Sequence, residues 1–183
     1  MMRNPLRHLD LPRSHDGTKD PLGHGGFVSA CLRGGSILML VVAAACAPAP
    51  QTSNTPPPGG ELPRSIVDPY LKIQLALADD STDGVKANAG AVATAATALG
   101  APAMKIDTAA VQLAAAGEID DARVKFATLS EAIDTYATGL KLKMPEGVHV
   151  AFCPMVEKPW MQEGTAINNP YYGKSMQTCG SLR

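Results

Sequence analysis

Two pairs of sulfur-bearing residues stand in the last third of the chain. Cys153 and Met155 are two positions apart, a spacing that places side chains on the same side of an extended backbone. Met176 and Cys179 are three positions apart, a spacing that a single turn brings together. Each pair therefore has the donor types and the spacing of a chelating arm for a metal ion.

The donor types indicate which cation such arms would select. Thiolates and thioethers prefer soft cations such as Cu(I) and Ag(I), whereas Zn²⁺ sites favour added histidine or carboxylate, and Ca²⁺ and Mg²⁺ require oxygen. His149 is the one histidine that follows residue 46. A blue-copper site with two histidines and a cysteine is therefore excluded in that part of the chain.

A disulfide between Cys153 and Cys179 is the alternative use of the same cysteines. An oxidising cell envelope permits it, and the two cysteines beyond residue 46 form an even pair. Closing a loop of about 26 residues would stabilise the fold by about 3 to 4 kcal/mol. Met155 and Met176 would then fill gaps in the core, which is the commonest use of methionine. On the residues alone the disulfide is the favoured interpretation.

The residues that usually carry catalysis form no recognisable pattern. There is no histidine near a Ser or Cys nucleophile motif and no glycine-rich phosphate loop. Asp79–Asp80 and Asp120–Asp121 lie at expected helix boundaries, where capping explains them. Trp160 and Tyr171–Tyr172 are expected to cover the C-terminal loop, and Asn169–Pro170 indicates a turn. We expect no enzymatic activity and no organic substrate.

The elements that must position these residues are expected to be helices. Asp68–Pro69 is a favourable helix start, and apolar residues then recur at spacings of three and four. The same spacing predicts helices over 85–99, over 107–116, and from Asp120 or Asp121 to Leu140. The expected fold is all-α: a small antiparallel up-and-down bundle of about four helices, with an irregular C-terminal loop segment that bears the Cys and Met residues.

The N-terminal quarter has the pattern of an export signal. The run Ser36–Ala45 is apolar and uncharged, has the length of a signal-peptide core, and falls short of the roughly 20 residues of a membrane-spanning helix. Ala43–Cys46 resembles a bacterial lipobox, in which the cysteine is lipidated; the alternative is ordinary signal cleavage, with Cys46 as a bystander. The Pro-rich stretch that follows predicts a tether. The expected parts are an N-terminal extension plus signal peptide at 1–45, a lipid-anchored tether at 46–62, and a helical domain with a C-terminal metal segment at 63–183.

The charge distribution bears on the class of partner. The whole chain holds 16 basic and 17 acidic residues. Residues 46–183 hold 11 Lys and Arg against 14 Asp and Glu, which gives this part a net charge of −3. Nucleic-acid binding needs a basic surface that releases phosphate counterions. We therefore expect no nucleic-acid partner.

Four motifs in order resemble the bacterial domain of unknown function family 3347. They are Tyr70-Leu-Lys-Ile with Leu75-Ala-Leu-Ala-Asp-Asp, Ala122-Arg-Val-Lys-Phe-Ala-Thr-Leu-Ser-Glu-Ala, Cys153-Pro-Met, and Ile167-Asn-Asn-Pro-Tyr-Tyr-Gly with Met176 and Cys179-Gly. The resemblance covers roughly residues 66 to 180. One difference is the short Val156–Pro159 stretch before Trp160, where the family pattern implies a longer, glycine-containing one.

The resemblance implies a role in metal handling. The family occurs as stand-alone envelope proteins and as an extension of periplasmic adaptor subunits of Cus-type copper/silver efflux systems. Its pattern implies Cys153, Met155, Met176 and Cys179 as ligands, and this raises the metal interpretation above the disulfide.

We therefore expect a lipoprotein of the cell envelope, anchored in a membrane through Cys46 and facing the periplasm. It would bind Cu(I) or Ag(I), and would buffer the metal or deliver it to an efflux adaptor protein. The alternative is a non-catalytic structural or interaction module of the envelope, with a Cys153–Cys179 disulfide.

Overall fold

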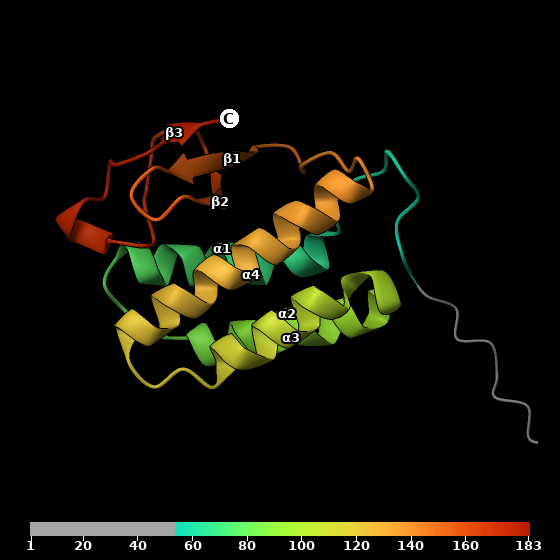
Figure 1. The fold of residues 1–183 in the computed structure, drawn as a ribbon, viewed down its shortest axis with the longest axis horizontal. Helices are drawn as coiled ribbons and strands as arrows, with labels where there is room; N and C mark the ends of the chain where they lie inside the picture. The colour runs from blue at the N-terminus through green and yellow to red at the C-terminus, as the bar shows by residue number, and fades with distance from the viewer. Residues whose placement is uncertain (1–53) are drawn as a thin grey trace, which may run out of the picture. The chain divides into compact units, whose positions relative to one another are not determined.

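Four α-helices and a small antiparallel sheet make up residues 54–183, which are the residues that the computed structural model describes (Figure 1). The predicted signal peptide at 1–45 and the predicted lipidation site Cys46 lie outside the described residues. The elements in chain order are α1 (Arg64–Ala78), α2 (Val85–Leu99), η1 (Ala101–Ala103), α3 (Met104–Ala114), α4 (Ile119–Gly139), β1 (Val148–Cys153), β2 (Lys158–Glu163), η2 (Gly173–Ser175) and β3 (Ser181–Leu182).

The expectation of an all-α bundle with an irregular C-terminal loop segment is wrong, because the segment forms a three-stranded sheet. The strand order is β2-β1-β3, and both pairings are antiparallel. β1 and β2 form a hairpin in which Cys153 lies opposite Lys158. β3 joins the other edge of β1, where Ser181 lies opposite Phe152. The chain therefore combines a helical layer with a sheet.

The sequence of β2 lacks the usual signals of a strand, and the reasons are physical. Pro159 cannot donate to a strand ladder, and a proline inside a run argues against a strand. β2 contains no β-branched residue, and the four residues from Pro159 to Gln162 are all buried. A strand that is buried on both faces shows no alternation of apolar and polar residues, so it lacks the usual period of two.

Helix α1 begins earlier than the predicted start at Asp68–Pro69. It begins at Arg64 and contains Pro69 in its second turn. Ile66 and Val67 are fully buried and continue the apolar stripe of the helix by one turn toward its N-terminus. Proline costs the hydrogen bond to the carbonyl of Ser65, but Ser65 is exposed, so water can satisfy that group. Burial of the apolar stripe therefore outweighs the proline signal.

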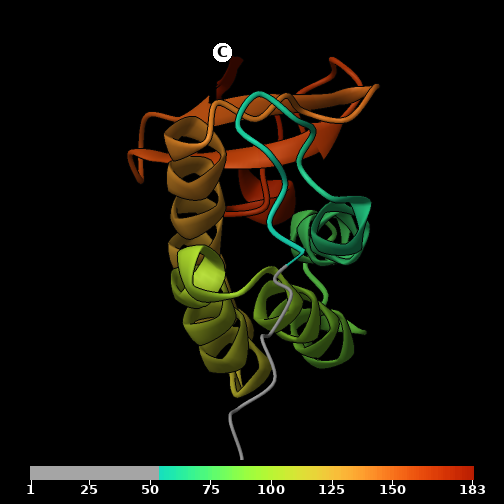
Figure 2. The same ribbon diagram turned by 90° about the vertical axis from the view of Figure 1, so that its right-hand side faces the viewer.

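The other helices lie close to their predicted ranges. α2 spans Val85–Leu99, and α4 spans Ile119–Gly139 with Asp120–Asp121 in its first turn. α3 begins at Met104, three residues before the predicted start at Asp107. Consecutive helices pack against each other, and β2 packs on both α1 and α4, so the sheet covers these two helices (Figure 2). None of the helices in residues 54–183 combines the length and the apolar composition that crossing a membrane requires.

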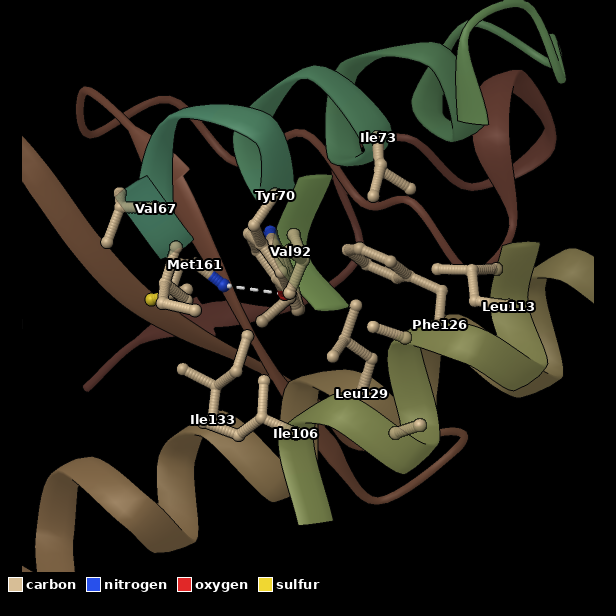
Figure 3. Packing of buried hydrophobic residues seen from close by; sticks show 14 of the residues in the cluster. Val67, Tyr70, Ile73, Val92, Ile106, Leu113, Phe126, Leu129, Ile133 and Met161 are labelled. Atoms are coloured by element: carbon tan, nitrogen blue, oxygen red, sulfur yellow. Dashed lines mark hydrogen bonds between the residues drawn. The ribbon is translucent and has the colours of Figure 1, made fainter. Parts of the chain in front are cut away.

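Aromatic side chains form the contact between the helical layer and the sheet. The rings of Tyr70 on α1 and Phe126 on α4 stack with centroids 4.8 Å apart. The hydroxyl oxygen of Tyr70 accepts a hydrogen bond of 3.2 Å from the backbone N–H of Met161 on β2 (Figure 3). The two layers therefore share one hydrophobic core.

Residues 54–62 belong to the folded part, although the sequence predicts a tether up to residue 62. The backbone N–H of Asn54 donates to the carbonyl oxygen of Ala98 at 3.1 Å, and that of Gly59 donates to Leu140 at 2.9 Å. Leu62 is fully buried. The described part of the predicted tether is thus fixed along the helices.

Candidate metal centre

Cys153 is the last residue of β1, and its side chain is enclosed by the core. It is 0% exposed, as is Ala151 two positions earlier, which is the alternation that a strand imposes. Its Sγ accepts a hydrogen bond from Nδ2 of Asn169 at 3.3 Å. The thiol is not in a disulfide. The sulfur of Cys153, as a metal ligand, would thus be screened from water and oriented by one amide group.

Cys179 approaches Cys153 because β3 pairs with β1. Ser181 lies opposite Phe152, so the antiparallel register continued by one residue places Gly180 opposite Cys153. A Cβ at Gly180, whose φ is 135°, would lie 2.6 Å from the Trp160 ring. Only glycine permits this close approach. Cys179 is half-buried, and its thiol is also free.

The two methionines lie in different environments. Met176 shares a turn with Cys179, because the N–H of Cys179 donates to the carbonyl oxygen of Met176 at 3.0 Å. Met176 is half-buried. Met155 lies in the turn between β1 and β2, and 62% of its surface is exposed. The structure thus brings the sulfur of Cys153 and the main chain of Cys179 to one amide group, holds Met176 in the adjoining turn, and leaves Met155 on the surface.

Asn169 connects the two cysteines. It is fully buried, and its Nδ2 donates to the carbonyl oxygen of Cys179 at 2.8 Å as well as to the sulfur of Cys153. Its Oδ1 accepts from the N–H of Tyr171 at 2.8 Å, and its own N–H donates to the carbonyl oxygen of Gln177 at 2.7 Å. The sequence indicates only a turn here, since the type of residue does not show which distant groups it will meet.

A second buried amide, Gln162 on β2, supports this segment. Its Oε1 accepts from the indole N–H of Trp160 at 3.0 Å and from the backbone N–H of Asn168 at 3.2 Å. Its Nε2 donates to the carbonyl oxygen of Ala166 at 2.7 Å. From α1, Nε2 of Gln74 donates to the carbonyl oxygen of Asn168 at 2.6 Å. Gln74, a glutamine inside the apolar stripe of α1, is the one sequence signal for this network.

Arg123 on α4 fixes the C-terminal segment to the helices. Its guanidinium donates to Asp80 Oδ1 at 2.5 Å and to the carbonyl oxygen of Pro170 at 3.2 Å. Asp80 Oδ2 also accepts from the N–H of Lys174 at 3.3 Å. The hydrogen bond from Arg123 lowers the pKa of Asp80. Gly173, with φ of 55°, lies against this pair, where a Cβ would be 1.9 Å from Asp80 Oδ1. The expectation that capping explains Asp80 is therefore wrong.

Trp160 and Tyr171 cover the segment from the core side, as the sequence predicts. Both are buried, and their rings meet edge to face with centroids 5.9 Å apart. The Tyr171 hydroxyl donates to the carbonyl oxygen of Pro159. Burial raises the pKa of Tyr171, so this hydroxyl stays protonated and donating at neutral pH. These rings pack in the core and have a structural role.

The chemistry of the donor set limits what the centre could hold. In the part of the chain from residue 54 onward, no three side chains drawn from His, Cys, Asp and Glu converge as a metal site would require. The predicted donors are two thiols and thioethers, which form a different kind of group. Such a set fits a soft cation of low coordination number and does not fit Zn²⁺, Ca²⁺ or Mg²⁺.

The chain matches no protein family model, no curated protein and no solved structure. The resemblance to the domain of unknown function family 3347 therefore stays a prediction from the motifs.

Proposed function

We propose that this chain is an exported lipoprotein, anchored through Cys46 and facing the periplasm, that binds Cu(I) or Ag(I) and buffers the cation or delivers it to an efflux adaptor. Cys153 and Cys179 would supply thiolates, and Met176 a thioether from the adjoining turn. Met155, exposed on the β1–β2 turn, would be the outermost donor. The cation is cargo in this proposal, and the protein is not an enzyme.

The observation that carries the proposal is the position of both cysteines at one buried amide. Asn169 donates to the sulfur of Cys153 and to the main chain of Cys179, and both thiols are free. Two thiolates with a thioether suit a soft cation. A hydrogen-bond donor next to a ligating atom is the usual outer partner that orients such a ligand.

Titration with Cu(I) tests the proposal. We would use the full chain with Cys31→Ser and Cys46→Ser, reduced and kept free of oxygen, against a competing Cu(I) chelator. We expect tight one-to-one binding that is lost in the Cys153→Ser/Cys179→Ser variant and weakened in Met176→Leu. Met104→Leu is the control, because Met104 is an exposed methionine on α3. The Cu(I) affinity of this variant should equal that of the parent. A parent protein that does not bind Cu(I) would contradict the proposal.

A second candidate is an interaction module closed by a Cys153–Cys179 disulfide. The observation in its favour is the register that places Gly180 opposite Cys153, since a disulfide needs neighbouring backbones. Thiol counting on protein taken from the envelope under alkylating conditions separates the two candidates. Absence of free thiol, together with a lower melting temperature after reduction, would favour the module; two free thiols would exclude it.

A further inference from the structure

One amide group uses both of its N–H bonds at the two cysteines. Nδ2 of Asn169 lies 3.3 Å from the Sγ of Cys153 and 2.8 Å from the carbonyl oxygen of Cys179. The orientation of the amide is fixed, because its Oδ1 must face the N–H of Tyr171, which can only donate. The nitrogen end therefore has to face the cysteines.

We propose that Asn169 is the positioning residue of the metal centre: it holds the sulfur of Cys153 as a hydrogen-bond acceptor and fixes the main chain at Cys179 beside it. This inference rests on the proposed function, and it adds a residue that the four predicted ligands do not include. Asn169 binds no metal itself and acts through the two cysteines.

The burial of Cys153 explains why such a donor is needed. The side chain is 0% exposed, so water does not reach the sulfur at this position. A buried acceptor depends on a donor from the protein for its hydrogen bond, and that donor also orients it. Among the hydrogen bonds of residues 54–183, the Asn169 amide supplies the one donor to this sulfur. A purely structural role at Cys179 would not require the bond to Cys153.

Two isosteric substitutions on neighbouring residues separate positioning from general destabilisation. Asn169→Asp keeps the oxygen that accepts from Tyr171 and replaces the donor that faces the cysteines with a second acceptor. Asn168→Asp makes the same chemical change one position earlier, where the side-chain oxygen accepts from Gln177 Nε2 at 2.9 Å. We would measure Cu(I) affinity and apo-protein stability for both variants in the background with Cys31→Ser and Cys46→Ser.

We expect Asn169→Asp to lower Cu(I) affinity by about 10- to 100-fold, the range for loss of an outer partner of a metal ligand. Asn168→Asp should leave the affinity within about twofold of the parent, since its side chain accepts from Gln177, which is not a predicted ligand. A folded Asn169→Asp protein with the affinity of the parent would overturn the inference. Equal losses in the two variants would overturn it as well, because they would indicate a general effect of the added charge.

A measurement on the parent keeps the test valid if Asn169→Asp does not fold. In ¹⁵N-labelled parent protein, Cu(I) should shift the side-chain Nδ2–H signals of Asn169 much more than those of Asn168. Unmoved Asn169 signals in protein that has bound Cu(I) would overturn the inference alone. A parent that binds no Cu(I) would overturn the proposed function first, and this inference with it, so the two failures are distinguishable.

Discussion

At the scale of single residues, one hydroxyl group joins the helical layer to the sheet. Ser130 Oγ donates to the carbonyl oxygen of Phe126 at 2.9 Å, so the 2.6 Å contact between Ser130 and Tyr70 has the tyrosine as donor. The same Tyr70 oxygen accepts from the N–H of Met161. Burial raises the pKa of Tyr70, and the hydroxyl therefore stays protonated. The Tyr70 hydroxyl thus joins α1, α4 and β2.

Tyr70→Phe should lower the free energy of unfolding by about 1 to 3 kcal/mol, because it leaves the N–H of Met161 buried without an acceptor. Urea denaturation followed by circular dichroism measures the change. Tyr136→Phe is the matched control: its hydroxyl is buried without a hydrogen-bond partner among residues 54–183, so its removal should be neutral or stabilising. Equal losses in the two variants would contradict this account.

The same scale shows how much of the candidate site the sequence could predict. The pairing of cysteine with methionine is visible as spacing, so the candidate donors can be named without a structure. The roles of Asn169 and Gln162 were not predictable, because each bonds groups from other parts of the C-terminal segment. The sequence also gave no sign that Met155 and Cys153 would differ in exposure, since their spacing predicts one extended strand and the chain turns after Cys153.

At the scale of elements, a charged pair connects the end of α1, helix α4 and the C-terminal segment. Arg123 donates to Asp80 and to the carbonyl oxygen of Leu77 at 3.1 Å, and Asp80 accepts from the N–H of Lys174. The hydrogen bond from Arg123 lowers the pKa of Asp80 below its usual value of 3.8. Ionised Asp80 therefore stabilises the fold above its unfolded-state pKa, and this contribution is lost as the pH falls through the lower folded-state pKa.

Asp80→Asn should make the protein less stable at pH 7, and the deficit should shrink as the pH falls into the acid range below about 4. The parent loses its ionised carboxylate there, whereas the variant has none to lose. Urea unfolding at a series of pH values measures both proteins. Asp68→Asn is the control, because its exposed pair with Arg64 at 3.6 Å should contribute about 0.5 kcal/mol or less. A deficit that does not change with pH would contradict the role of the Asp80 charge.

Elements differed in how well the sequence predicted them. The amphipathic helices α2 and α4 were predictable because a stripe at spacings of three and four persists over several turns. α1 was predicted one turn too short, because proline is common at the first position of a helix and Pro69 therefore indicates a start there. The sheet was missed because β2 is buried on both faces and contains proline, and β3 is only Ser181–Leu182. The formation of β2 depends on pairing with β1 and on packing against α1 and α4, which are tertiary contacts that the sequence does not show.

At the scale of the whole molecule, the attachment of residues 54–62 limits the distance between the domain and the proposed anchor. Asn54 is hydrogen-bonded to Ala98 and stands eight positions after Cys46 in the sequence. Eight extended residues span at most roughly 29 Å. A lipid on Cys46, as proposed above, would thus hold the domain close to the membrane surface.

Membrane attachment through Cys46 predicts different results for two cysteine substitutions outside the described residues. Cys46→Ser should move the protein from the detergent-extractable membrane fraction to the soluble envelope fraction and abolish incorporation of labelled fatty acid, because lipidation needs the thiol. Cys31→Ser makes the same change upstream of the expected processing site and should leave both results as in the parent. If Cys46 were a bystander of ordinary signal cleavage, the parent and both variants would all be soluble and unlabelled. The comparison therefore tests the lipid anchor independently of the metal centre. A soluble parent would contradict the anchor and would leave the proposed binding of Cu(I) or Ag(I) untouched.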